Sequence, residues 1–210
     1  MVNIQKGETF KRQMIDLQSY LENKLRAVIS AWDENDIYAI SFFVYSNEEY
    51  EYNGCSNVTK FAVSYNTEKD CNGAGELSEE RWNYAFWRQD ETPIIDAERE
   101  NEGIKILFDW YKEKGIDNIG YEDCDACYDD EMRYIGKGPV GYYELLSEIT
   151  AVAKGLQVSG FIKNKFGAPI PIIIHDLEYP WYILEATKKA NPTGEADAFF
   201  AAMKELGFAE

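Results

Sequence analysis

The sequence predicts an α+β fold in which several amphipathic helices pack on a central, mostly antiparallel sheet. Helix-like and strand-like stretches occur in both halves of the chain, and they do not follow a regular β-α-β alternation. The chain has 210 residues, of which 45% are hydrophobic and 15% are aromatic. This composition supplies a sizeable core, and the length fits one domain over residues 1–210.

The first predicted element is an amphipathic helix from about Thr9 to Trp32. Its apolar side chains recur every three or four residues, which places them on one stripe of a helix. They are Phe10, Met14, Leu17, Leu21, Leu25 and Ile29.

Two strands are predicted next. Ile37–Tyr45 is rich in β-branched and aromatic residues and is apolar at both odd and even positions. A strand that is apolar on both faces is expected in the centre of its sheet. Asn47–Gly54 is predicted to be an acidic turn, and Val58–Tyr65 to be the antiparallel hairpin partner.

The middle of the chain is less regular. The glycines of Asp70–Gly75 indicate a loop. Ser78–Arg88 combines a helix-like start with alternating aromatic residues, so we expect a short helix that passes into a strand. Asp96 is a candidate N-cap for a helix that Gly115 ends.

The second half begins with a poorly periodic, acidic excursion at Gly115–Gly138. A helix is expected from Pro139 to Lys154, with Gly155 as its terminator. Ile170–Tyr179 is predicted to be a strand near an edge of the sheet or at a strand start, because of its prolines. Asn191–Gly207 is predicted to be a last helix, with Asn191 as its N-cap and a proline in its first turn.

The charge is distributed unevenly along the chain. The formal net charge is −17, and residues 31–135 carry nine basic and 26 acidic side chains. Such a polyanion repels nucleic acid and anionic membranes, so neither is expected as a partner. Residues 31–135 either supply solvated loop surface or form a negative face that steers a basic protein partner.

The sequence favours a cytoplasmic protein. The N-terminal segment has no apolar signal-peptide region, and no stretch approaches the roughly 18 apolar residues of a membrane-spanning helix. Four cysteines without an export signal are typical of reduced thiols.

Two segments contain candidate metal ligands. Cys124 and Cys127 have the spacing of half a zinc site, but Cys55 and Cys71 are far away in the sequence, so ordinary thiols are favoured. The acidic run Glu122–Glu131 lacks the glycine and glutamate positions of an EF-hand loop, and a solvated surface is favoured over calcium binding. No cofactor is predicted, since no phosphate-binding glycine motif occurs.

His175 is the only histidine. Any Ser-His or Cys-His mechanism would have to use it, and it is followed by Asp176. A lone histidine in an apolar strand is more often packed than catalytic, and no Gly-x-Ser-x-Gly motif supplies a nucleophile. A small hydrolytic or small-molecule-processing enzyme that uses carboxylates with His175 is therefore the alternative function.

The aromatic run WNYAFW at residues 82–87 is the most distinctive patch. Large aromatic side chains dominate core burial, so a core position is favoured. The alternative is that one edge is exposed as an anchor at a protein interface.

With this run, the chain resembles a bacterial family of unknown function, domain-of-unknown-function family 4303. The other segments of the resemblance are IYAISFFVY, VSYNTE, IIIHDLEY and the late Ala190-Asn191-Pro192, so it covers nearly the whole chain. The family has no established activity, and the resemblance therefore implies no catalytic residue. The Cys124–Cys127 segment does not match the family pattern. Small acidic bacterial proteins of this kind are similar to the immunity proteins of polymorphic toxin systems.

The function predicted from these observations is a non-enzymatic, cytoplasmic binding module that docks a basic protein through its acidic region. An immunity protein is one form of this function. The residues predicted to bind the partner are Trp82, Tyr84, Trp87, Asp123, Asp125, Asp129 and Asp130.

Overall fold

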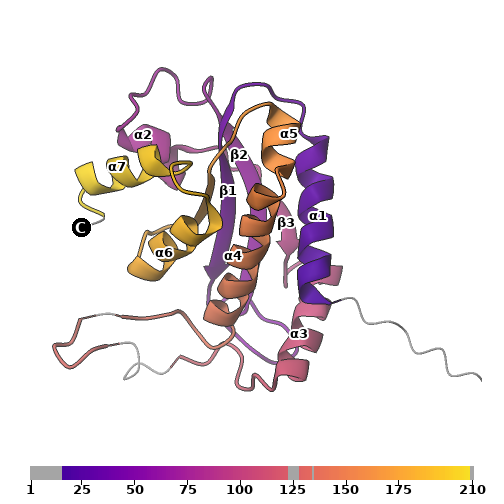
Figure 1. The fold of residues 1–210 in the computed structure, drawn as a ribbon. Coiled ribbons are helices and arrows are strands. Elements are labelled where there is room, and N and C mark those ends of the chain that lie inside the picture. The colour runs from indigo at the N-terminus through magenta and orange to yellow at the C-terminus, as the bar shows by residue number, and fades with distance from the viewer. Residues whose placement is uncertain (1–15, 123–127, 134, 209–210) are drawn as a thin grey trace, which may run out of the picture.

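The computed structural model describes residues 16–122, 128–133 and 135–208 (Figure 1). The described residues form one hydrophobic core cluster around a four-stranded sheet. The elements follow in the order α1 (Leu17–Ala31), β1 (Ile37–Ser46), β2 (Thr59–Thr67), α2 (Glu79–Trp82), η1 (Tyr84–Phe86), β3 (Thr92–Ile95), α3 (Glu102–Lys114), α4 (Tyr142–Val158), α5 (Phe161–Phe166), β4 (Ile172–His175), α6 (Trp181–Ala190) and α7 (Asp197–Glu205).

The sheet has the strand order β3-β2-β1-β4. β2 pairs antiparallel with β1 and with β3, whereas β4 pairs parallel with β1. The predicted α+β class with a mostly antiparallel sheet is therefore confirmed, as are the central position of β1 and its hairpin with β2. β4 lies at an edge, as its flanking prolines indicated.

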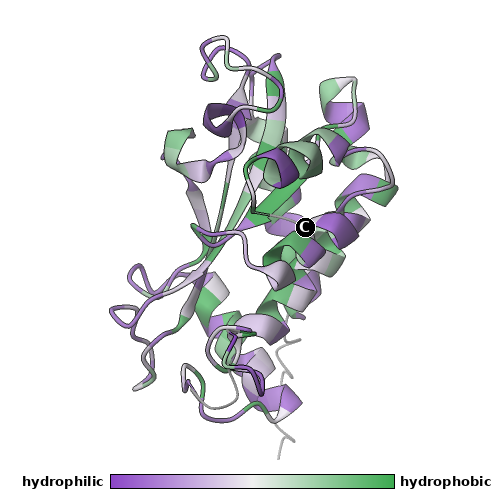
Figure 2. Ribbon diagram, turned by 90° about the vertical axis from the view of Figure 1, so that its left-hand side faces the viewer, coloured by the Kyte–Doolittle hydropathy of each residue, from purple (hydrophilic) through white to green (hydrophobic). Residues whose placement is uncertain are grey.

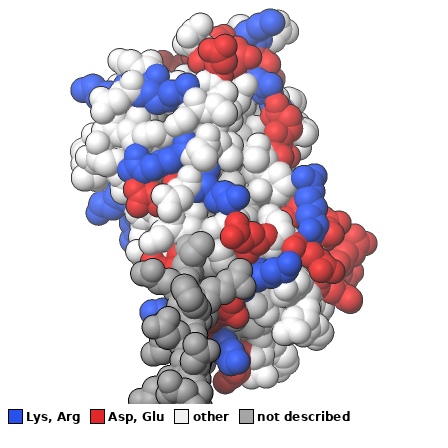
Figure 3. Space-filling model, turned by 90° about the vertical axis from the view of Figure 1, so that its right-hand side faces the viewer, with Lys and Arg blue, Asp and Glu red and all other residues white. Residues whose placement is uncertain are grey.

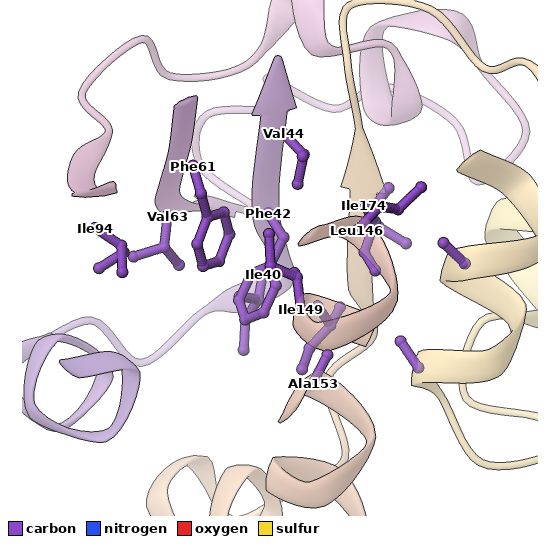
Figure 4. Packing of buried hydrophobic residues seen from close by; sticks show 14 of the residues in the cluster. Ile40, Phe42, Val44, Phe61, Val63, Ile94, Leu146, Ile149, Ala153 and Ile174 are labelled. Carbon is purple, nitrogen blue, oxygen red and sulfur yellow. The ribbon is translucent and has the colours of Figure 1, made fainter. Parts of the chain in front are cut away.

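One face of the sheet is apolar and carries mainly aliphatic side chains together with two phenylalanines. Ile40, Phe42 and Val44 of β1 lie on this face with Phe61 and Val63 of β2, and the rings of Phe42 and Phe61 are 5.2 Å apart. Figure 4 shows these side chains facing those of α4, which are Leu146, Ile149 and Ala153. Figure 1 shows α1 and α4 lying across this face, and the hydrophobic residues in Figure 2 concentrate on the strands and on the helix sides next to them. We call this the aliphatic face.

The opposite face carries polar and aromatic side chains. Strand residues alternate between faces, so Ser41 and Phe43 of β1 lie on this second face. Their partners in the register are Ser64 of β2 and His175 of β4. The segment from α2 to β3 covers them through Trp82, Tyr84 and Trp87, which are all buried. We call this the polar-aromatic face.

Polar side chains of α6 and of the residue after it close the β4 edge of the sheet. Asn191 donates to the carbonyl of Ile172 and accepts from its amide, both at 2.8 Å. The Thr187 hydroxyl accepts from the amide of Ile174 at 3.0 Å and donates to its carbonyl at 3.1 Å. An edge strand with free backbone groups invites pairing with another chain, and these two side chains remove that opportunity.

The β3 edge is closed in a similar way. The carbonyl of Ile94 accepts hydrogen bonds from the Tyr20 hydroxyl at 3.0 Å and from the side-chain amide of Asn101 at 3.2 Å. Gly103 lies so close that a Cβ atom there would be 2.2 Å from the Ile94 carbonyl oxygen. Only glycine allows α3 to begin against this edge.

The structure corrects the predicted elements in the middle of the chain. The strand expected within Ser78–Arg88 does not form, since α2 passes into the 3₁₀ helix η1, whose start Asn83 caps by accepting from the Ala85 amide. The N-cap of α3 is Asn101, not Asp96, which lies in the preceding turn. Gly115 ends α3 in the left-handed region, as predicted.

The predictions for the second half are also corrected in part. α4 begins at Tyr142 and continues through Gly155 to Val158, because Gly155 has helical neighbours that pack in the core. β4 is only four residues long. Asn191 follows α6 and binds β4 instead of capping α7, which begins at Asp197. The part of the predicted first helix before Asp16 lies outside the described residues.

In the part of the chain that the structure describes, no helix is long and apolar enough to cross a membrane.

Candidate functional site

Three acidic loops meet at the end of the sheet where β1 finishes. Loop 47–58 connects β1 to β2, and loop 96–101 follows β3, whose last residue pairs with Phe61 near the start of β2. Lys60 of β2 contacts both loops: its Nζ is 3.7 Å from Asp96 and 3.5 Å from Glu98 in loop 96–101, and 5.5 Å from the ring centre of Tyr50 in loop 47–58. We call this region the exit end of the sheet; it lies at the bottom of Figure 1.

The third loop of the exit end is the excursion at 115–138. Its neck is closed by two backbone hydrogen bonds, from Gly120 to Val140 and from Val140 to Tyr121, both at 3.0 Å. Asn57 of loop 47–58 donates to the carbonyl of Gly120 at 3.1 Å, which ties the neck to the first loop. In the described part, residues 115–138 contain no helix or strand of the sheet.

Several carboxylates at the exit end lack a cationic neighbour. Among the described residues, no ion pair involves Glu48, Glu49, Glu51 or Glu100, and all four are exposed. Glu51 and Glu100 line one open hollow, although they lie far apart in the sequence. The fold therefore places negative charges from distant parts of the sequence close together, which the sequence alone does not show.

The acidic region as a whole does not form one face, which corrects the simplest form of the sequence prediction. A second group of exposed acids lies where β1 begins, in loop 32–36, loop 68–78 and α2. We call this region the entry end. One of its cations, Arg81, binds Glu68 with nitrogen–oxygen distances of 2.8 and 2.6 Å, while Asp33, Glu34, Glu76, Glu79 and Glu80 take part in no ion pair among the described residues. In Figure 3, Asp and Glu side chains likewise form separate groups with Lys and Arg among them.

The acidic residues predicted to bind a partner are only partly placed. Asp123 and Asp125 lie outside the described residues. Asp129 accepts hydrogen bonds from the backbone and side chain of Arg133, which hold its pKa below the usual value. Asp130 is exposed. Asp129 is thus largely neutralised within its own loop, whereas Asp130 adds to the acidic surface of the exit end.

The predicted aromatic anchors belong to the core. The exposed fractions of Trp82, Tyr84 and Trp87 are 3%, 8% and 5%. Trp82 and Trp87 donate their indole hydrogens to backbone carbonyls at 2.7 and 2.8 Å, so their polar atoms are also satisfied. These three residues therefore occupy the core position that the sequence favoured, and the alternative of an exposed edge does not hold for them: the exposed aromatic of this run is Phe86, at 52%.

His175 is fully buried on the polar-aromatic face. Its Nε2 is 2.8 Å from the Ser41 hydroxyl, and its ring lies among Phe43, Tyr84 and Trp87, with centroids 4.4 to 5.7 Å away. Among the described residues its Nδ1 has no hydrogen-bond partner. Burial lowers the pKa of His175 to about 3, so the ring is neutral at pH 7. A buried neutral imidazole beneath three aromatic rings has no route to a substrate, and this arrangement does not favour a general base.

Asp176 follows His175 and lies on the side of α4. The Tyr142 hydroxyl, which is 2.9 Å from its Oδ2, is the main partner, and the Tyr182 hydroxyl is 3.5 Å away. Burial raises the pKa of Asp176 to about 6. A carboxylate with a raised pKa is a candidate for acid-base chemistry, but Asp176 does not line the open hollow that Glu51 and Glu100 share.

No metal site is found among the residues with a described position, where no group of three or more His, Cys, Asp or Glu side chains could hold an ion. Cys55 and Cys71 are free thiols, and burial raises the pKa of Cys71. Cys124 and Cys127 lie outside the described residues.

No family model, no curated protein and no solved structure matches the chain. The resemblance to family 4303 stays a prediction.

Sequence reasoning missed the surface that the exit end exposes between β4 and α6. Leu177 and Trp181 are each 46% exposed there. The apolar residues of Ile170–Tyr179 predict one long strand. The signal that could have shortened the strand is the Asp176–Tyr179–Pro180 spacing, since an aspartate and a proline this close are typical of a turn.

Proposed function

We propose that the protein is a non-enzymatic binding module, acting in the cytoplasm, that captures a basic protein through the exit end. The observation that carries this proposal is the meeting of three acidic loops, in which Glu48, Glu49, Glu51 and Glu100 have no cationic neighbour among the described residues. Unpaired carboxylates gathered on one end attract a basic surface and steer its approach.

An immunity protein that neutralises a basic toxin is one specific form of this function, by analogy with the small acidic immunity proteins of polymorphic toxin systems. Both edges of the sheet are closed by polar side chains, so strand addition is not the binding mode we propose. Loops at one end of a rigid sheet are instead the contact surface.

The test compares two variants that remove the same number of charges. The exit-end variant carries Glu48→Gln, Glu49→Gln, Glu51→Gln, Glu98→Gln and Glu100→Gln. The entry-end variant carries Asp33→Asn, Glu34→Gln, Glu76→Gln, Glu79→Gln and Glu80→Gln. Each variant and the wild type are immobilised and used to capture proteins from a lysate of the source cells.

We expect a basic protein that the wild type and the entry-end variant retain and that the exit-end variant loses. With this protein purified, raising the salt from about 0.05 to 0.5 M should lower its on-rate by roughly tenfold or more. Equal retention by the two variants, or an on-rate that salt does not change, would contradict the proposal.

The alternative, an enzyme that uses carboxylates with His175, stays a prediction, and the burial of His175 gives it no support.

A further inference from the structure

The exit end also exposes apolar side chains. Ten large hydrophobic residues are exposed in the described part of the chain, and six of them belong to the excursion or to the segment after β4. These six are Tyr121, Tyr128, Met132, Ile135, Leu177 and Trp181. The other four are spread over the rest of the surface. Apolar side chains exposed at the same end of the sheet as unpaired carboxylates have the composition of a protein interface, in which an apolar centre is surrounded by a charged rim.

The segment after β4 is tied to the exit end by the parallel pairing of β4 with β1. Phe43 and His175 are partners in this pairing, so the residues that follow His175 emerge beside the end of β1. Asp176 accepts a hydrogen bond from the Glu178 amide at 3.2 Å, which closes a tight turn around Leu177. Pro180 then caps α6, and Trp181 is the first residue of that helix. Leu177 and Trp181 are thus held on a short and rigid support.

Folding alone does not account for Leu177. Its φ is 81°, a region that residues other than glycine rarely adopt, so the backbone is strained there. The side chain is nevertheless 46% exposed. The chain therefore accepts backbone strain at a residue whose apolar side chain is half in water, and such strain is typical of functional positions.

Trp181 can contact the cationic side chains of a basic partner. The face of an indole ring attracts lysine and arginine cations, and tryptophan is among the residues that contribute most at protein interfaces. Trp181 contacts Tyr182 edge-on, with ring centroids 5.7 Å apart at 88°. Nearly half of its surface remains open.

We propose that Leu177 and Trp181 are the apolar anchor of the partner-binding surface, and that the partner presents apolar side chains between its lysines or arginines. This inference rests on the proposed function, because the charge complementarity of the exit end is what selects a basic protein as the occupant.

The experiment uses two labelled peptides as probes, measured by fluorescence anisotropy. The first is a helical peptide with lysines on one face and leucines on the other. The second has the same length and lysine positions, with serine in place of each leucine. The proteins are the wild type, Trp181→Ala, Leu177→Gly, the exit-end charge variant and Phe86→Ala, which removes an exposed aromatic at the entry end.

We expect the wild type to bind the lysine–leucine peptide at least tenfold more tightly than the lysine–serine peptide. Trp181→Ala and Leu177→Gly should abolish this difference, whereas Phe86→Ala should keep it. Leu177→Gly also serves as a control for folding, because glycine adopts the positive φ at this position without strain. Its urea midpoint should stay the same or rise while its binding falls.

The outcomes separate the two proposals. The anchor proposal is wrong if both peptides bind the wild type equally, or if Trp181→Ala keeps the preference for the lysine–leucine peptide. In either case the charge proposal still stands, provided that the exit-end charge variant binds both peptides more weakly than the wild type does. If that variant binds both peptides as the wild type does, the proposed function fails. Absence of binding by either peptide contradicts both proposals.

Discussion

On the face covered by α4, β1 contributes Ile40, Phe42 and Val44, whereas on the other face the same strand contributes Ser41 and Phe43. The aliphatic face is stabilised by burial of hydrocarbon, which depends little on direction. The polar-aromatic face depends on specific hydrogen bonds such as Ser41–His175 and Ser64–Asp90, both 2.8 Å long. The first kind of packing supplies most of the stability, and the second fixes where the covering segment lies.

The same contrast holds for the titratable groups at the end of β4. His175 and Asp176 are neighbours in the sequence, but one lies under the aromatic rings and the other under Tyr142 of α4. Burial disfavours the charged form of both. It therefore lowers the pKa of the histidine and raises that of the aspartate, and the two groups respond to pH in opposite directions.

The largest effect is expected from truncating the aliphatic face. Phe42→Ala removes a fully buried ring that contacts Phe61, and we expect a loss of about 3–5 kcal/mol of unfolding free energy. Its neighbour Ser41→Ala, on the polar-aromatic face, removes one partner of a buried hydrogen bond and should cost about 1–2 kcal/mol. Urea unfolding at pH 7 measures both, and equal losses would show that the two faces do not differ as described.

The second largest effect is the dependence of the unfolding free energy on pH that His175 contributes. Its pKa is about 3 in the folded state, against about 6.5 in an unfolded chain, so the unfolded state takes up the proton first as pH falls. This contribution to stability is complete above pH 6.5 and is lost as pH falls towards 3, with a loss of about 3 kcal/mol by pH 4.

Comparison with His175→Gln tests this expectation, because the carboxylates titrate in both proteins. Urea unfolding between pH 7 and pH 4 should show a steeper loss for the wild type. Parallel curves would mean that His175 is solvated and not buried as the structure shows.

The smallest effect is expected at Asp176. Its pKa of about 6 lies above the unfolded value of about 3.9, so its contribution is most favourable below pH 4 and is lost as pH rises through 6. Asp176→Asn should therefore stabilise the protein by roughly 1–2 kcal/mol at pH 7.5 and have little effect at pH 4. Thermal unfolding at the two pH values measures the difference. A variant that is less stable than the wild type at pH 7.5 would show that the bond from Tyr142 outweighs the cost of burying the charge.

Elements with a local signal are predictable from the amino-acid pattern. The periodicity of Leu17, Leu21, Leu25 and Ile29 places one stripe of α1 in the core, and these four residues are buried. The two-sided apolar pattern of Ile37–Tyr45 placed β1 in the centre of the sheet, and the glycine at 115 ended α3. In each case a side-chain pattern within a few turns or one strand is sufficient, because burial of one face decides the conformation.

How separate segments meet depends on long-range packing, which the local pattern does not show. Asn191 has the pattern of an N-cap, but its four polar contacts with Ile172, Thr187 and Gln157 place it at the edge of β4 instead. Trp82, Tyr84 and Trp87 are buried because they cover the polar-aromatic face, whereas Phe86 of the same run is exposed. The acidic loops separate into an exit end and an entry end because β2 reverses the chain between them. Charge and capping potential are properties of residues, whereas their partners are set by strand order and register, which no local pattern encodes.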